Sequence, residues 1–141
     1  MQDKKVRKPM RRKGIAILSV LAMLLFTASV ALAGSPHFVD ITTTVSGNTL
    51  TVSGKEAGLG NETQVHIVVS ATAQCINPGD HHPKAANKQS VSAEGDFPVQ
   101  NGKAVFSLTL TATFQPDCTP PMSVVFTDIT VSDEAHGISW P

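Results

Sequence analysis

The feature that most constrains this chain is an alternation of apolar and polar residues with a period of two. Residues 64–75 and residues 103–114 each place six apolar side chains at every second position, mostly with Ser, Thr and Gln between them. This is the pattern of a β-strand with one buried face, because successive side chains of a strand point to opposite sides. After residue 33 the chain holds thirteen Thr, twelve Val and five Ile against four Leu. Since β-branched side chains favour strands over helices, the sequence predicts an all-β protein.

Shorter alternating runs predict four further strands, at residues 38–45, 50–52, 91–97 and 122–132. Six or seven strands without a helix favour an antiparallel β-sandwich, and a small β-barrel is the alternative. The strand pattern resembles that of immunoglobulin-like domains of secreted bacterial proteins, which implies two packed sheets. No named family is recognised beyond this resemblance.

Two local signals refine the strand plan. Asn101-Gly102 predicts a type I′ hairpin, because both central residues of that turn need a positive φ. Near Phe126 the apolar positions change phase, which predicts a β-bulge or a strand buried on both faces. In residues 38–45 one face is expected to combine four side chains, which are Val39, Ile41, Thr43 and Val45.

The first 33 residues have the layout of a secretory signal peptide. Seven Lys and Arg precede Gly14, an apolar run follows at 15–30, and Ala31-Leu32-Ala33 offers small residues for cleavage. We therefore expect residues 1–33 to be removed and residues 34–141 to form one secreted domain, extracellular or in the cell envelope. An uncleaved membrane anchor is the alternative. With cleavage, contact with a membrane is confined to the signal peptide.

The charge of the expected mature chain limits its partners. Residues 34–141 contain four Lys, no Arg and ten Asp and Glu, which gives a net charge of −6 with His neutral. Such a chain is poorly suited to nucleic acid, whose phosphates are bound by Lys and Arg. One Trp and no Tyr also disfavour an interface anchored by aromatic side chains. The expected partner is an unidentified extracellular protein or surface, and such a binding module should expose an apolar patch or an unprotected sheet edge.

The two cysteines, Cys75 and Cys118, are expected to form a disulfide, because export places them in an oxidising compartment. Alternating strand directions bring both sulfur atoms to the same end of the sandwich. The bond would also tie the loop at 76–89 to the loop at 115–121. A redox-active or catalytic thiol is disfavoured, because no CxxC motif is present.

No cofactor is expected, but one loop offers a candidate metal site. Asp80, His81 and His82 could bind Zn²⁺ or Cu²⁺ together with Asp117, which the disulfide would bring near. Adjacent histidines on an extended backbone point to opposite sides, so a solvated polar loop is the simpler interpretation.

Two histidines and three acidic residues near the C-terminal end are also interpreted as surface groups. His66 falls on the polar face of its strand, and His136 falls in a polar C-terminal tail. Asp128, Asp133 and Glu134 do not have the spacing of a calcium loop, so they are interpreted as solubilising charges. Asn61 begins a glycosylation sequon, which matters only if the host glycosylates.

No catalytic motif is present: there is no GxSxG, no Gly-rich phosphate loop and no evident carboxylate pair. The sequence therefore favours a non-catalytic structural or binding module over an enzyme. Two alternatives stay open, a secreted metal-binding protein that uses the Asp80-His81-His82 loop and a small secreted hydrolase.

Overall fold

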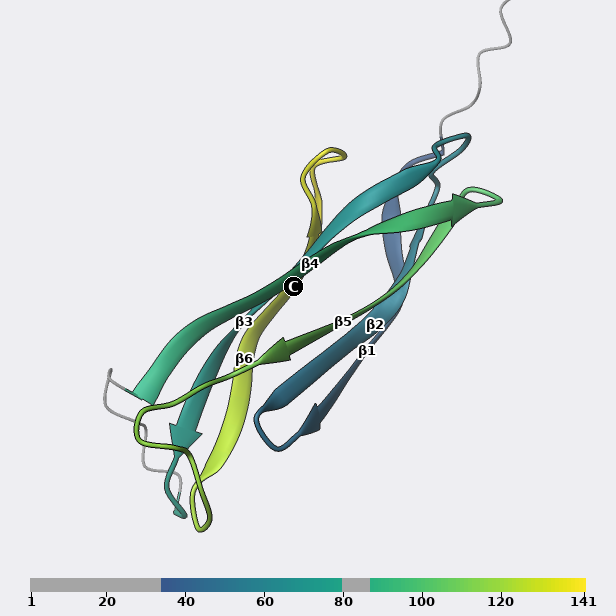
Figure 1. The fold of residues 1–141 in the computed structure, drawn as a ribbon. Coiled ribbons are helices and arrows are strands. Elements are labelled where there is room, and N and C mark those ends of the chain that lie inside the picture. Colours follow the sequence, from purple (N-terminus) through teal and green to yellow (C-terminus); the bar gives the residue numbers. More distant parts are fainter. Residues whose placement is uncertain (1–33, 80–86) are drawn as a thin grey trace, which may run out of the picture. The chain divides into compact units, whose positions relative to one another are not determined.

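The computed structural model describes residues 34–79 and 87–141, and this part of the chain contains seven β-strands and no α-helix (Figure 1). The strands are β1 (His37–Ser46), β2 (Thr49–Ala57), β3 (Gln64–Ile76), β4 (Lys88–Gln100), β5 (Lys103–Thr111), β6 (Ser123–Asp133) and β7 (Ile138–Trp140). The prediction of an all-β protein is confirmed. The signal peptide and its cleavage site lie outside the described residues. No helix in the described ranges is long and apolar enough to span a bilayer.

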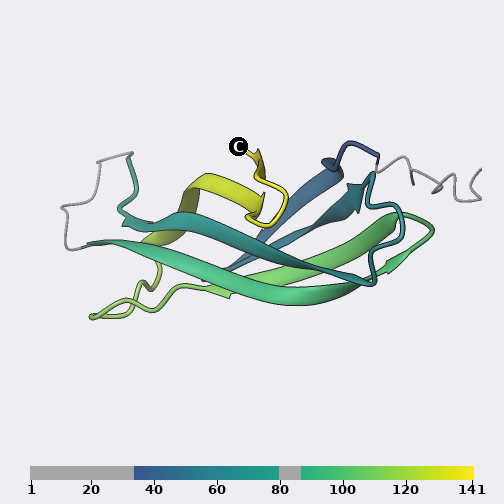
Figure 2. The same ribbon diagram turned by 90° about the horizontal axis from the view of Figure 1, so that it is seen from above.

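All strand pairs are antiparallel, and the strand order is β1-β2-β5-β4-β3-β6-β7. Three strands, β1, β2 and β5, form one layer, and the other four form the second. The layers are joined where β4 pairs with β5, at Val99↔Ala104 and Gln100↔Lys103 only. Figure 2 shows β3 (teal) between β4 (green) and β6 (yellow-green). The predicted antiparallel fold of six or seven strands is confirmed. The strands form one continuous sheet, and contact between β1 and β7 makes it nearly closed and barrel-like, which lies between the predicted sandwich and its barrel alternative.

The core is built from the alternating positions that the sequence indicates. Along β3 every second side chain is buried, from Val65 to Cys75. The facing positions of β5 include Ala104, Phe106 and Leu110, all buried. Phe106 contacts two further rings, with centroid separations of 6.1 Å to Phe38 and 6.0 Å to Phe97. The predicted faces of these two long strands are therefore correct.

The predicted hairpin and the predicted bulge are both present. Asn101 and Gly102 have φ of 53° and 74°, as a type I′ turn requires. In β6, Thr127 pairs with Thr72 and Thr130 pairs with Ser70, so two residues oppose one. The first of these two, Asp128, has a φ of 51°. This bulge returns Val131 and Asp133 to the buried face of β6.

Three expectations are wrong, and each error has a physical reason. A second bulge, between Val39 and Thr42, changes the phase of β1, so Phe38 and Ile41 pack on the core while Val45 is 51% exposed. The second strand runs to Ala57, because β5 pairs with it along its whole length. The C-terminal tail is not a polar extension, since it contains β7, which pairs with β6.

The β1 bulge leads to a prediction about Gly54. Ile41 packs so closely over this glycine that an added Cβ would overlap the Ile41 side chain and press on Phe106. We expect Gly54→Ala to lower the free energy of unfolding by about 1–3 kcal/mol, as overpacking does in other cores. Urea denaturation measures the difference.

Gly95→Ala is the matched control, because Gly95 also lies inside a strand but its added Cβ would meet only ordinary contact distances. Equal effects of the two substitutions would contradict the proposed role of Ile41.

Candidate functional site

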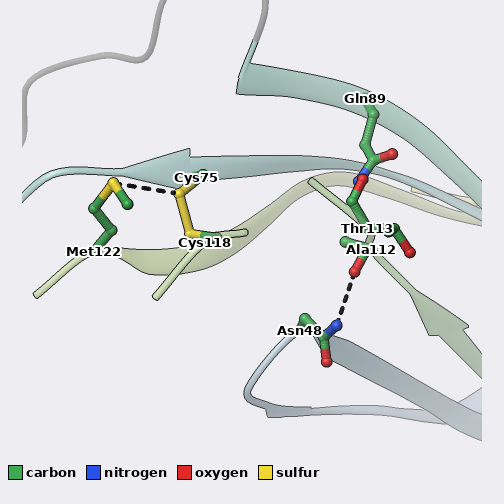
Figure 3. The surroundings of a disulfide bond; sticks show 7 residues. All are labelled: Asn48, Cys75, Gln89, Ala112, Thr113, Cys118 and Met122. Carbon is green, nitrogen blue, oxygen red and sulfur yellow. Dashed lines mark hydrogen bonds between the residues drawn. A yellow bond between two sulfur atoms is a disulfide. The ribbon is translucent and has the colours of Figure 1, made fainter. Parts of the chain in front are cut away.

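One end of the body is closed by a disulfide between Cys75, near the end of β3, and Cys118, in the loop that follows β5 (Figure 3). The predicted pairing and the predicted meeting of both cysteines at one end are confirmed. The sulfur atom of Met122 lies 3.9 Å from Sγ of Cys75, a packing contact because a bridged sulfur atom carries no proton. We call this region the disulfide end.

Side-chain amides hold the chain that leaves β5 at this end (Figure 3). Asn48 donates from Nδ2 to the carbonyl oxygen of Ala112 at 2.9 Å, and Gln89 donates from Nε2 to that of Thr113 at 2.9 Å. Beside them lies a hollow of about 690 Å³, whose lining includes Val45, Phe114 and Cys118. The disulfide end is therefore fastened to β1–β2, β3 and β4.

We expect the disulfide to contribute a large part of the free energy of unfolding. The bond joins cysteines 43 residues apart. The Cys75→Ala/Cys118→Ala variant is expected to lose about 4 kcal/mol of unfolding free energy, because the unfolded chain regains the entropy of the open loop. Chemical denaturation of the oxidised protein and of the double variant measures the loss.

Reduced wild-type protein is the control, and it should unfold at the same denaturant concentration as the double variant. A variant as stable as the oxidised protein would contradict the prediction.

The predicted metal loop is not tested by this structure. Asp80, His81 and His82 lie outside the described residues. Asp117 is exposed in the loop that contains Cys118. The site therefore remains a prediction.

The opposite ends of β3 and β6 carry an arrangement that the sequence analysis missed. Four titratable side chains meet there, and we call them the carboxylate–histidine cluster: Glu56 of β2, Glu62 of the β2–β3 loop, Asp133 of β6 and His136 of the β6–β7 turn. Nδ1 of His136 lies 2.7 Å from Oδ2 of Asp133 and 3.5 Å from Oε1 of Glu56. Nε2 of the same ring lies 2.7 Å from Oε1 of Glu62.

Three of the four side chains in the cluster are largely withdrawn from solvent, whereas that of Glu62 is 43% exposed. The side chain of Glu56 is 0% exposed, that of Asp133 is 1% exposed and that of His136 is 18% exposed. The expectation that His136 lies exposed in a polar tail is therefore wrong, because the β6–β7 turn folds it against β2. Asp133 is likewise not a solubilising charge.

Local structure explains why these side chains point inward. Glu56 continues the buried series Leu50, Val52 and Gly54 of β2, so its carboxylate lies on the core-facing side. Asp133 shares the phase of Val131 beyond the β6 bulge. Its Oδ1 accepts hydrogen bonds from the backbone N–H groups of Ala135 and His136, at 2.8 and 3.3 Å. This turn holds the imidazole ring over Asp133.

The surroundings shift two pKa values strongly. Burial, followed by the nearby charge of Asp133, raises the pKa of Glu56 from 4.5 to about 7. Hydrogen bonds that the ring donates to Asp133 and to Glu62 raise the pKa of His136 from 6.5 to about 9. Near neutral pH the ring is therefore a cation, whereas Glu56 lies close to its midpoint of titration.

These shifts predict how stability depends on pH in metal-free protein. Folded Glu56 holds its proton up to a higher pH than unfolded Glu56, so the fold loses stability as pH rises from about 4.5 to about 7. Charged His136 stabilises the fold below about pH 6.5, and this contribution is lost as pH rises to about 9. The free energy of unfolding should therefore fall with rising pH, by at most about 1.4 kcal/mol for each unit of pKa shift.

Urea denaturation in the presence of a chelator, at about pH 5, 7 and 9, measures this dependence. Glu56→Gln should remove the fall in the free energy of unfolding between about pH 5 and 7 that is due to Glu56. The fall at higher pH that is due to His136 should remain. Stability that rises over this range would refute the assignment.

His66 has a simpler environment. It is exposed on β3, as expected, and its Nδ1 lies 2.7 Å from Oδ1 of Asp96. The hydrogen bond to Asp96 is the main cause that raises its pKa. Nε2 lies 3.5 Å from Glu94.

The cluster can hold a proton or a cation, since it combines one imidazole nitrogen atom with carboxylate oxygen atoms. Within residues 34–79 and 87–141, neither His66 nor His136 forms a hydrogen bond with a serine hydroxyl. Comparison with protein-family models, with curated proteins and with solved structures found no match.

A signal for the cluster was present in the sequence. Extending the alternation of Leu50 and Val52 by four residues places Glu56 on the buried face. Extending the shifted phase of Ile129 and Val131 does the same for Asp133. Nothing local indicates that these two strands end beside each other.

Proposed function

We propose that this chain is an exported, non-catalytic structural or binding module, and that the free edge of β1 holds an extended segment of a partner protein. The observation that carries the proposal is the edge formed by residues 42–46. β1 is the first strand in the sheet order, so among the described residues β2 is the only strand that pairs with it. All five side chains are exposed, and none is charged or proline. Proteins usually block such edges with Lys, Pro or a covering element.

The backbone at this edge is suited to strand addition. Gly47 has a φ of 57° in a two-residue turn that pairs Ser46 with Thr49. Hydrogen-bonded and non-bonded pairs alternate away from such a turn, so Thr43 and Val45 direct their backbone N–H and C=O groups away from β2. An extended peptide can pair with these groups, as in other complexes formed by strand addition.

The outer face beside the edge favours a partner strand with hydroxyl side chains. Nine Ser and Thr form three rows across β1, β2 and β5, which are Ser46–Thr49–Thr111, Thr44–Thr51–Thr109 and Thr42–Ser53–Ser107. Hydroxyl groups pair within two rows, at 3.0 Å for Thr51 and Thr109 and 2.9 Å for Ser53 and Ser107. An added strand that carries Ser or Thr at alternate positions would extend these rows.

Two observations support export. The basic and apolar leader at residues 1–33 has the layout of a signal peptide. The disulfide is typical of proteins from an oxidising compartment. The disulfide and the aliphatic core also make the β-sheet a rigid support for the unpaired edge of β1.

Photo-crosslinking in cells that produce the full chain tests the proposal. A benzophenone amino acid at Val45 should give a discrete adduct with another protein. Thr43→Pro should abolish this adduct, because it removes an outward N–H donor and leaves the β1–β2 ladder intact. The same probe at Val105 is the matched control, since Val105 is 66% exposed on β5.

Equal adducts from both positions, or none from Val45, would refute the proposal. An adduct of twice the mass of this chain would identify a second copy as the occupant and would also overturn the assignment of a different partner protein.

A further inference from the structure

The carboxylate–histidine cluster poses a problem that the proposed function does not address. Glu56 is fully buried, yet neither of its carboxylate oxygen atoms has a hydrogen-bond partner among the described residues. A buried carboxylate without a donor is costly, so native proteins satisfy such groups with a hydrogen bond, a counter-ion or a metal. Among the described residues, the basic nitrogen atom that approaches Glu56 is Nδ1 of His136, which is 3.5 Å away and is closer to Asp133.

The donor atoms of the cluster converge on one point. One carboxylate oxygen atom from Glu56, one from Asp133 and a ring nitrogen atom of His136 all lie within 4.8 Å of one another. They come from two strands of different layers and from the β6–β7 turn. An ion among them would supply what the Glu56 oxygen atoms lack.

We propose that Glu56, Asp133 and His136 form a binding site for a divalent transition metal of the Zn²⁺ class. Two carboxylates balance the charge of such an ion, and an imidazole nitrogen atom is a ligand that Zn²⁺ accepts and that Ca²⁺ and Mg²⁺ rarely use. Three protein ligands leave one coordination position for water. The site depends on neither the β1 edge nor a partner protein.

Glu62 supports the same assignment from outside the site. It accepts a hydrogen bond from Nε2 of His136 at 2.7 Å, which directs Nδ1 toward Glu56 and Asp133. Histidines that bind metals commonly donate their other N–H to a carboxylate in this way, which fixes the ring orientation. In the metal-free protein a proton on Nδ1 bridges the ring to Asp133, and the metal would replace that proton.

The position of the site indicates a structural role. The bound ion would join the end of β2 to the end of β6 and to the β6–β7 turn. The disulfide fastens the opposite ends of β3 and β6, so the metal and the disulfide would secure the two ends of the same body.

Calorimetric titration with Zn²⁺ after removal of metal by a chelator tests the site. The protein should carry His81→Ala/His82→Ala, so that the loop at 80–82 contributes no imidazole. We expect one equivalent of Zn²⁺ to bind and to raise the melting temperature. Glu56→Gln and His136→Gln should each weaken binding by at least about tenfold, as changes around metal ligands do.

His66→Gln is the matched control, because it removes a histidine that also contacts two carboxylates but lies on the surface. It should leave the affinity unchanged. Glu56→Gln keeps the shape of the side chain and removes a buried charge, so the variant should fold, and its circular dichroism spectrum checks this.

A direct measurement covers the case in which a variant does not fold. In the His81→Ala/His82→Ala protein, Zn²⁺ should shift the ¹⁵N signals of the His136 ring and leave those of His66 in place. Failure to bind Zn²⁺, binding that Glu56→Gln does not weaken, or shifts confined to His66 would overturn the proposal. None of these results bears on the β1 edge, so the two proposals fail separately.

Discussion

The structure depends on the burial of one continuous apolar face along β3 and β5. Every second side chain of these strands enters the interior, and Phe106 contacts rings from β1 and β4. Most side chains in the core are small or medium-sized aliphatic groups, so the core buries little aromatic surface. Such a small core gains much from covalent or ionic fastening at its ends. The disulfide and the carboxylate–histidine cluster lie where that fastening is needed.

Two β-bulges decide which side chains reach the interior. The bulge at Asp128 returns β6 to a phase in which Val131 and Asp133 point inward. The bulge after Val39 turns Ile41 over Gly54 and leaves residues 42–46 outside the core. The bulge in β6 therefore creates part of the carboxylate–histidine cluster, and the bulge in β1 creates the exposed edge. Both proposed sites arise at points where regular alternation is interrupted.

The two ends of the body use different chemistry to hold strands together. At one end a covalent bond and two side-chain amides tie the loop after β5 to its neighbours. At the other end charged groups from β2, the β2–β3 loop and β6 meet around His136 of the β6–β7 turn. The first fastening responds to redox conditions, whereas the second responds to protons and to metal ions. The stability of the fold is thus linked to the redox conditions at one end and to pH and metal ions at the other.

The sequence by itself determined the strand class, the buried faces of β3 and β5, the Asn101-Gly102 hairpin and the pairing of Cys75 with Cys118. These features follow from local periodicity, from turn stereochemistry and from the presence of only two cysteines. The tertiary structure alone decided that Glu62 meets His136, 74 residues away, and that β1 changes phase at Asp40. Alternation tells which side of a strand a residue occupies, but not which strand lies opposite. A bulge in β1 is likewise set by its partner β2, so apolar spacing within β1 did not reveal it.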